Sequence, residues 1–348
     1  MNYYPLIKPL LFKLDPEVAH SLTLKGLKFS HTAGLDKILN PAFIAKPVTV
    51  MGLDFVNPVG LAAGLDKNGD YIDALAGLGF GSLEIGTVTP LPQPGNPKPR
   101  LFRLVEHQAI INRMGFNNQG VDYLIEQVKK SQYKGVLGIN IGKNFATPIE
   151  KATDDYLICL RKAYLLASYI TINISSPNTK NLRQLQQGDE IKQLLSALKQ
   201  EQLQLEQQHN KYTPIVVKIA PDLSDEEIQH IAGLLVEFSI DGVIATNTTL
   251  ERSAVEGHPL ADEMGGLSGS PVKQQATYVV RRLADELQGR LPIIAVGGIM
   301  NSTDAQEKLD AGASLVQLYS GLIYQGPNLV NDIMRGLSSE HLISGNLL

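Results

Sequence analysis

Amide, hydroxyl and ammonium side chains recur at the ends of short apolar segments in this 348-residue chain. In residues 171–180, TINISSPNTK, an apolar run stops at two serines, a proline and an asparagine. A primary amide both donates and accepts hydrogen bonds, so it matches the lactam and imide edges of a flat heterocycle. A lysine buried beside such groups would lose its hydration, which favours a bound anion or an electron-rich ring next to it. These residue types favour binding of a hydrogen-bonding heterocycle.

Other kinds of chemistry lack their residues in this sequence. No HExxH motif, no paired acidic residues and no histidine follow the apolar segments, so neither metal-assisted nor two-carboxylate hydrolysis is favoured, and we expect no metal site. The single cysteine, Cys159, excludes an internal disulfide and a thiolate zinc site. A formal net charge of -4 argues against a nucleic-acid partner. Redox chemistry on a bound cofactor gains weight, because the cofactor then carries the difficult step.

The polar groups belong to a regular series of strand-like segments, each rich in β-branched residues and bounded by Gly, Pro or Asn. The eight segments are 57–69, 81–90, 136–144, 169–178, 214–222, 241–249, 292–299 and 314–324. Helical patterns separate most of them, most clearly over 154–169, 190–208, 224–238 and 271–287. Eight strand–helix units predict an α/β fold of the (β/α)8 TIM-barrel type, whose chemistry collects at the carboxyl ends of the strands. An open doubly wound sheet is the alternative, disfavoured because no GxGxxG follows the first strand.

Two long connections interrupt this spacing, a proline-rich one over 89–120 and a glycine-rich one over 251–273. We expect both to be unstructured loops that serve as lids or ligand walls. Two glycines, Gly297 and Gly298, end the seventh strand segment, and Tyr-Ser-Gly ends the eighth. Glycine lets backbone N–H groups approach a ligand closely, so this pair of turns predicts a phosphate site.

The first residues carry two short amphipathic patterns. Leu6, Ile7, Leu10, Leu11 and Leu14 share one helical stripe, and Asp15-Pro16 offers a cap and a first-turn proline for a second helix. We predict an N-terminal helical hairpin over 1–40, followed by the barrel over 41–348. The hairpin is either a flap packed on the barrel or an interfacial anchor with its apolar face in a membrane.

Nine motifs occur in one order along nearly the whole chain: GLAAGLDKNG, EIGTVTPLPQPGNPKPRLFRL, INRMGFNNQG, NISSPNT, VKIAPDL, ATNTT, GGLSGSP, VGGI and QLYSGLIY. Together they resemble the membrane-associated, quinone-dependent class of dihydroorotate dehydrogenases. The resemblance implies an FMN-bearing barrel that oxidises dihydroorotate to orotate in de novo pyrimidine (UMP) biosynthesis and passes the electrons to a membrane quinone. It also implies a peripheral place on the cytoplasmic face of the cell (inner) membrane, with contact through the N-terminal helices.

The resemblance also assigns roles to residues. The catalytic base would be Ser176, where the related soluble class carries cysteine, and Thr179 would belong to its proton relay. FMN would bind at Ala63, Gly64, Leu65, Asp66, Lys67, Thr87, Asn140, Asn173, Lys218, Thr246, Gly269, Gly298, Tyr319 and Ser320. The substrate would bind at Lys67, Asn112, Arg113, Met114, Gly115, Phe116, Asn173, Asn178, Asn247 and Thr248. His20 and Arg103 would lie near the quinone.

One departure from the family pattern lies in the loop expected to cover the site. The family continues SSPNT with Pro-Gly-Leu-Arg, whereas this chain has Lys180-Asn181-Leu182-Arg183. Two other functions compete with the dehydrogenase. One is an RNA-modifying flavin barrel similar to the tRNA dihydrouridine synthases, disfavoured because no basic extension is present. The other is a non-catalytic barrel that binds a phosphorylated ligand at a membrane, which would need no hydroxyl after the fourth strand.

Overall fold

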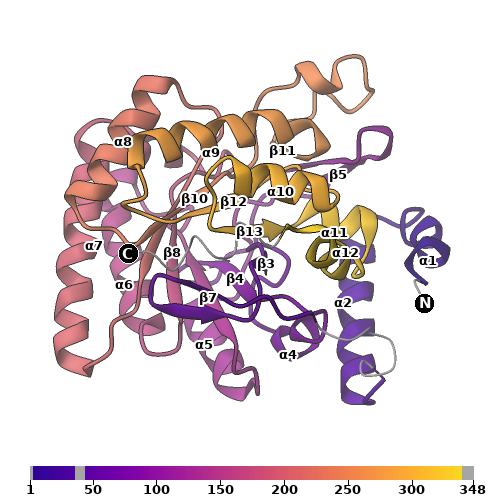
Figure 1. Cartoon of the computed structure of the whole chain (residues 1–348), viewed down its shortest axis with the longest axis horizontal. Helices are drawn as coiled ribbons and strands as arrows, with labels where there is room; N and C mark the ends of the chain where they lie inside the picture. The colour runs from indigo at the N-terminus through magenta and orange to yellow at the C-terminus, as the bar shows by residue number, and fades with distance from the viewer. Residues whose placement is uncertain (1–2, 36–43, 339–348) are drawn as a thin grey trace.

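A closed barrel of eight parallel strands forms the centre of the computed structural model, which describes residues 3–35 and 44–338 (Figure 1). The order around the barrel is β10-β12-β13-β3-β4-β7-β8-β9. The strands are β3 (Val59–Leu61), β4 (Ser82–Val88), β7 (Val136–Ile141), β8 (Tyr169–Asn173), β9 (Ile215–Ile219), β10 (Gly242–Ala245), β12 (Ile293–Val296) and β13 (Leu315–Leu318). Every residue of these strands is buried, as expected where helices cover one side and packed side chains fill the other. Each strand lies inside one of the eight predicted segments, so the predicted (β/α)8 barrel is confirmed.

Helices surround the barrel and bury its outer face (Figure 1). They are α4 (Ile72–Ala76), α5 (Val121–Lys130), α6 (Ala152–Ala163), α7 (Gly188–His209), α8 (Asp225–Glu237), α9 (Lys273–Leu287), α10 (Ser302–Asp310), α11 (Ser320–Gln325) and α12 (Leu329–Gly336). Local sequence sets their ends. Ser224, for example, accepts the Glu227 N–H at 3.2 Å and donates its own N–H to the Glu227 carboxylate at 2.8 Å, which closes a capping box at the start of α8.

A small hairpin packs with the residues that fill the interior of the barrel. It consists of β1 (Val48–Val50) and β2 (Leu53–Phe55), which pair antiparallel. Val50 and Phe55 belong to the same buried cluster as Val136 and Tyr169, which begin two barrel strands. The hairpin thus lies at the amino ends of the strands, which leaves the carboxyl ends as the mouth.

The N-terminal region forms the two predicted helices, α1 (Tyr4–Leu11) and α2 (Pro16–Thr32), on one side of the barrel (Figure 1). Asp15 caps α2 as predicted, because its carboxylate accepts the N–H groups of Glu17 and Val18 at 2.9 and 3.1 Å. Helix α2 packs against α4 and β5, and α1 packs against α11. The predicted domain boundary at residue 40 lies outside the described residues.

The two long connections are not the unstructured loops that we predicted. They form a three-stranded antiparallel sheet from β5 (Leu101–Leu104), β6 (Ala109–Asn112) and β11 (Gly266–Gly269). The prediction failed because β6 and β11 are short and pair across more than a hundred residues of sequence, from Gly266 to Asn112. Local proline and glycine content therefore hid the strands. This sheet carries Asn112 to the barrel mouth.

Candidate active site

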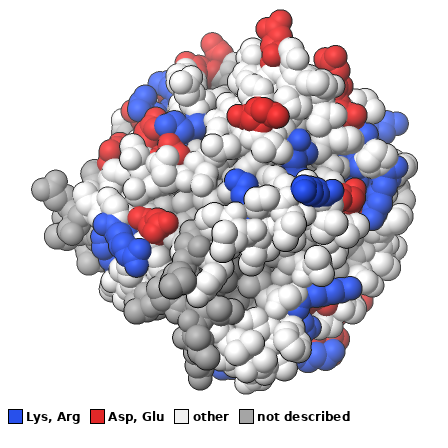
Figure 2. Space-filling model, turned by 90° about the vertical axis from the view of Figure 1, so that its right-hand side faces the viewer, with Lys and Arg blue, Asp and Glu red and all other residues white. Residues whose placement is uncertain are grey.

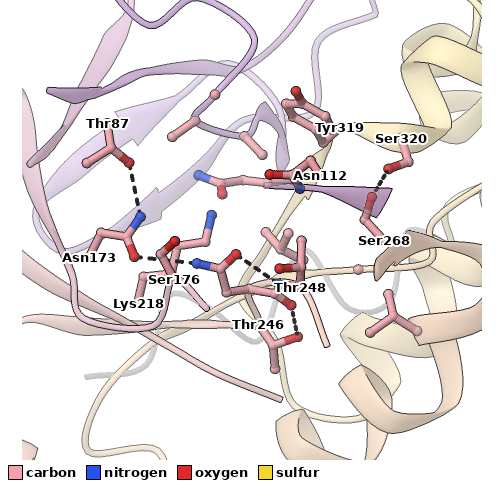
Figure 3. Close-up of a pocket in the computed structure, with 18 of the residues that line it drawn as sticks. Thr87, Asn112, Asn173, Ser176, Lys218, Thr246, Thr248, Ser268, Tyr319 and Ser320 are labelled. Atoms are coloured by element: carbon pink, nitrogen blue, oxygen red, sulfur yellow. Dashed lines mark hydrogen bonds between the residues drawn. The ribbon is translucent and has the colours of Figure 1, made fainter. Parts of the chain in front are cut away.

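The barrel strands and their loops enclose a cavity lined by most of the predicted site residues (Figure 3). Among the predicted catalytic and substrate residues, the lining contains Lys67, Asn112, Met114, Gly115, Phe116, Asn173, Ser176, Asn178, Asn247 and Thr248. Among the predicted cofactor residues it also contains Ala63, Gly64, Thr87, Lys218, Thr246, Gly269, Gly298, Tyr319 and Ser320. Parallel strands place their carboxyl ends at one rim, which is why residues more than two hundred positions apart meet here.

Four predicted residues do not line this cavity: Leu65, Asp66, Arg113 and Asn140. Asp66 instead accepts the N–H groups of Asp70 and Tyr71 at 3.0 and 2.8 Å, which shapes the turn after β3. Arg113 pairs with the Glu263 carboxylate at 2.6 Å, and its guanidinium stacks on a phenylalanine ring. The side chains of Asp66 and Arg113 therefore make contacts within the protein rather than in the cavity.

A chain of amides and hydroxyls runs along the wall of the cavity. Thr87 donates to the Asn140 side-chain oxygen at 2.6 Å, and the Asn173 amide donates back to the Thr87 hydroxyl at 3.0 Å. The Asn247 amide donates to the Ser175 hydroxyl at 2.9 Å and lies 3.4 Å from the Asn173 oxygen. Figure 3 shows Thr87, Asn173 and Ser176 directed toward the same space. Each amide is thereby fixed in orientation, so the wall offers a defined set of donors and acceptors to a ring.

A buried carboxylate, Glu84, orients this row of amides and hydroxyls from inside the barrel, although it is not among the residues predicted from the sequence. Its two oxygens accept from the Asn140 amide at 2.8 Å, from the Tyr169 hydroxyl at 2.9 Å and from the Gln317 amide at 2.8 Å. Glu84 has no exposed surface. A signal was available, because a charged residue inside the apolar strand segment SLEIGTV is almost never buried without partners.

Two lysines bring positive charge to the cavity. The Lys218 side chain is buried and reaches toward the space that Figure 3 shows. Burial lowers its pKa, while Glu84 acts in the opposite direction. Its ammonium has no hydrogen-bond acceptor within the part of the chain that the structure describes. Burial also lowers the pKa of Lys67, to about 8, and its ammonium donates to the Gly64 carbonyl at 2.7 Å.

Ser176 lies in the loop after β8, with 6% of its surface exposed. Its hydroxyl accepts the Asn178 N–H at 3.2 Å, which draws the loop into a tight turn. Arg183 holds this loop in place by donating to the Ser175 carbonyl at 3.0 Å and to the Thr248 carbonyl at 2.9 Å. The buried hydroxyls of Thr179 and Thr248 have no partner among the described residues, although only Thr248 lines the cavity.

The departure at Lys180-Asn181 has a structural explanation. Asn181 adopts a left-handed conformation with φ of 59°. Asparagine is the side-chain-bearing residue that, with aspartate, tolerates this conformation best, so it can stand where the family pattern has glycine. The loop therefore keeps a backbone that leads into the 3-10 turn Leu182–Gln186 and places Arg183.

The carboxyl ends of β12 and β13 form a cradle of backbone and hydroxyl groups. Gly298 has φ of +72°, and a Cβ there would lie 2.4 Å from the Lys273 Cα, so only glycine fits. Neither Gly297 nor Gly298 donates its N–H to an acceptor within residues 3–35 and 44–338. Ser320 lies on the same rim, with its hydroxyl 2.8 Å from that of Ser268 (Figure 3). Unused N–H groups beside a hydroxyl suit a phosphate.

Comparisons with known proteins agree with this geometry. The family model for dihydroorotate dehydrogenase matches residues 46–341. A dihydroorotate dehydrogenase (quinone) of Chromobacterium violaceum is 66% identical over 99% of both chains. The chain belongs to the dihydroorotate dehydrogenase family. Another relative with the same name, from Nitrosospira multiformis, is 62% identical over 97% of both chains.

Solved structures of the family have the same fold. A dihydroorotate dehydrogenase of Eimeria tenella in complex with ferulenol superposes with a TM-score of 0.84 at 38% identity, covering 92% of this chain and 90% of that one. A ligand-free form from the same organism gives 0.82 at 39% identity, covering 92% and 94%. The predicted family and its quinone-dependent class are therefore confirmed.

The structure has a second cavity, which the N-terminal helices form together with the barrel. It has a volume of about 810 Å³ and lies between the N-terminal helices and the barrel. Apolar side chains from α1, α2 and α4 dominate its wall, and Tyr319 lines both this cavity and the active-site cavity. His20 and Arg103, predicted near the quinone, line it, as does Leu65. Burial and the nearby Lys67 charge lower the pKa of His20 to about 4, so its imidazole is neutral at physiological pH.

Proposed function

We propose that this chain oxidises dihydroorotate to orotate with FMN as its flavin, and that a quinone removes the electrons through the second cavity. The enzyme class, a quinone-dependent dihydroorotate dehydrogenase, is that of relatives matching its full length. The observation that carries the finer proposal is a serine, two lysines and a set of fixed amides around one cavity. Full-length similarity to this family leaves little room for an RNA-modifying or non-catalytic barrel.

The cavity fits FMN on two grounds. Lys218 is a buried cation without an acceptor among the described residues, so it suits the acceptor atoms of the flavin's pyrimidine ring. The free N–H groups of Gly297 and Gly298, with the Ser320 hydroxyl, suit its phosphate. Bound FMN would supply the acceptor for the hydride that leaves C6 of dihydroorotate. Asn173, Thr87 and Thr246 would hold the ring system.

The remaining steps belong to the protein's own side chains. The Ser176 hydroxyl would take the proton from C5 of dihydroorotate. Free serine is a weak base, so it needs a site that excludes water and holds the hydroxyl in one direction. Burial of Ser176 and the hydrogen bond from the Asn178 N–H provide both. The Thr179 hydroxyl of the same loop, which is buried and without a partner among the described residues, would receive the proton next.

Substrate orientation would come from charge and from amides. Protonated Lys67 would pair with the carboxylate of dihydroorotate, while Asn112, Asn178 and Asn247 would hold the ring edges. The amide of Asn178 donates to the Asn112 side-chain oxygen at 3.2 Å, so these two residues act as one surface. Fixing substrate and base in one geometry can lower the barrier by several kcal/mol.

The N-terminal helices would lie on the membrane that holds the quinone. These helices expose Leu6, Ile7, Leu10, Val18, Leu22 and Phe29, between 49% and 75% exposed, and of these Leu6, Ile7 and Leu22 also line the second cavity. Figure 2 views this side of the molecule and shows an uncharged area toward its lower half, with Lys and Arg and also Asp and Glu around it. Such a face suits the interface of an anionic bilayer. No helix among the described residues is long and apolar enough to span one. On the strength of the exposed apolar residues of α1 and α2, we propose peripheral contact with the cytoplasmic face of the cell membrane.

Two observations test this function. Purified protein should be yellow and should bleach when dihydroorotate is added without oxygen, and its colour should return on adding a short-chain quinone. Colourless protein that takes up no FMN, or yellow protein that dihydroorotate does not bleach, would contradict the activity. For the membrane contact, the protein should float with vesicles containing anionic lipid, and protein that stays behind would contradict peripheral binding.

A further inference from the structure

An arginine outside the active-site cavity connects the N-terminal helices to the substrate loop. The Arg100 side chain is 7% exposed and lies between α2 and the segment that follows β4. Its Nε and Nη2 donate to the two carboxylate oxygens of Glu17 at 2.9 and 3.2 Å. Its Nη1 donates to the carbonyls of Pro94 and Asn96 at 2.7 and 2.9 Å. One guanidinium therefore ties the first turn of α2 to the 94–96 turn.

Asn96 carries this connection to the residues that would hold the substrate. Its side-chain amide donates to the Arg113 carbonyl at 2.9 Å and to the Asn178 carbonyl at 3.4 Å. Its backbone N–H donates to the Met114 carbonyl at 3.0 Å. The Asn112–Phe116 segment and the Asn178 carbonyl are thus both linked to Asn96, and through it to Arg100.

The turn is also packed tightly against the substrate segment. Gly95 has φ of +74°, and a Cβ there would lie 2.3 Å from the Met114 carbonyl oxygen and 2.8 Å from the Arg100 Nη1. The two backbones approach each other more closely than any side chain would allow. The Arg100 guanidinium holds the two carbonyls that flank Gly95, so its shift would move the 94–96 turn that packs against the Met114 carbonyl.

The Glu17 carboxylate can accept hydrogen bonds from Arg100 because it does not cap helix α2. Asp15 already accepts the first N–H groups of α2. The Glu17 carboxylate is 16% exposed and also receives Lys98 at 3.1 Å. Burial acts to raise the pKa of Glu17, but the hydrogen bonds from Arg100 and Lys98 outweigh it and hold the pKa below its ordinary value. The carboxylate therefore stays charged at physiological pH.

We propose that Glu17 and Arg100 are positioning residues for the substrate, linking the helix that walls the second cavity to the loops that hold the pyrimidine ring. The proposal rests on the proposed function. In this arrangement α2, which contributes Ala19 and His20 to the second cavity, also sets the position of Asn112 and Asn178. Releasing Glu17 frees the 94–96 turn and weakens substrate binding without touching the Ser176 hydroxyl.

The test uses full-length, FMN-loaded protein with the Glu17→Gln substitution, which keeps the size of the side chain and removes its charge. Orotate is titrated and followed by the change in flavin absorbance, and flavin reduction is timed against dihydroorotate concentration. We expect the orotate Kd and the dihydroorotate concentration at half-maximal rate to rise about fivefold or more, the lower end of typical coupling between sites. The limiting reduction rate at saturation should stay unchanged.

A matched control is available on the outside of the barrel. Arg161 donates from Nε and Nη2 to both oxygens of Glu201 at 2.8 and 2.6 Å, and the Glu201 side chain is 11% exposed. This pair joins α6 to α7, so Glu201→Gln removes an equivalent bidentate contact and should leave the orotate Kd at its wild-type value. Arg100→Lys keeps the charge but loses the planar fork, and it should weaken orotate at least as much as Glu17→Gln.

The outcomes separate the link from the activity. The wild-type protein could bind orotate and have its flavin bleached by dihydroorotate while Glu17→Gln shows the same orotate Kd as Glu201→Gln. That result would overturn the positioning role of Glu17 and Arg100 and leave the proposed activity standing. A fall in the limiting rate with an unchanged orotate Kd also overturns the link. Wild type that binds no orotate overturns both.

Discussion

The Asn140 side-chain amide donates to the Glu84 carboxylate at 2.8 Å in the interior of the barrel, one layer below the active-site cavity. Because the Asn140 side-chain NH₂ group donates to Glu84, the Asn140 side-chain oxygen faces the Thr87 hydroxyl and the Asn173 amide. The orientation of the cavity wall therefore depends on a charge that does not touch the cavity.

Replacing Glu84 with glutamine should disturb that wall. Glutamine brings an N–H₂ group to a place where only donors converge, so one buried donor loses its acceptor. We expect the free energy of unfolding to fall by about 1–3 kcal/mol and FMN to dissociate more readily. Urea unfolding and FMN titration measure the two effects. Tyr169→Phe is the control. It removes one donor from Oε2 of Glu84, whereas Asn140 donates to Oε1, so FMN affinity should stay unchanged. Equal affinity in both variants would contradict the role of Glu84.

Removing the Ser176 hydroxyl should slow the chemical step alone. Ser176→Ala should still bind FMN and orotate, because Arg183 continues to hold the loop through the Ser175 and Thr248 carbonyls. Its flavin should be reduced about 10²–10⁴-fold more slowly, the usual effect of a general base. Stopped-flow absorbance under anaerobic conditions measures this rate. Bleaching at a near wild-type rate would remove Ser176 from the role of base.

Substrate affinity should depend on pH through Lys67. Burial lowers the pKa of this lysine to about 8, so below that pH the ammonium is protonated and can pair with a carboxylate. The orotate Kd should be constant below about pH 8 and rise toward tenfold per pH unit above it, since the deprotonated amine offers no charge. Titrations from pH 6 to 9.5 test this. Lys67→Met should bind weakly at every pH, and an equally steep rise in that variant would assign the effect to another group.

Filling the second cavity should weaken the reaction with quinone and leave flavin reduction by dihydroorotate unchanged. Ala19 is 7% exposed and lines that cavity from α2. Ala19→Phe should raise the KM for a short-chain quinone severalfold, while the rate of bleaching by dihydroorotate stays the same. Val18→Phe, on the exposed face of the same helix, enlarges a neighbour outside the cavity and is the control. Equal quinone kinetics in the two variants would show that electrons leave by another route.

The loop over the site should tolerate glycine at position 181 and reject a β-branched residue. Asn181 has φ of 59°, a conformation that costs ordinary L-residues about 1–2 kcal/mol. Asn181→Gly should reduce its flavin at the wild-type rate, whereas Asn181→Val should shift the loop that carries Ser176 and slow reduction. Stopped-flow rates of the two variants decide. A fast valine variant would mean that this loop conformation does not limit catalysis.

Much of the barrel was predictable because its signals are local. The runs of valine and isoleucine and the helical patterns between them each lie within a few consecutive residues, and so do the Gly297-Gly298 turn and the Ser-Ser-Pro-Asn turn. The cap at Asp15 and the first turn of α2 followed from neighbouring residues as well. Such features depend on backbone preferences and on which face of a segment is apolar, and a single stretch of sequence carries that information.

The roles of Arg100 and Glu84 could be decided only by the tertiary structure. Arg100 meets Glu17 across 83 positions, and Glu84 meets Gln317 across 233. The short pairing of β6 with β11 was hidden for the same reason. Which amide faces which carboxylate is settled when the barrel closes and brings distant strands into register. The sequence by itself determined which groups the strand ends would present, whereas closure determined their partners, because hydrogen bonds form between neighbours in space.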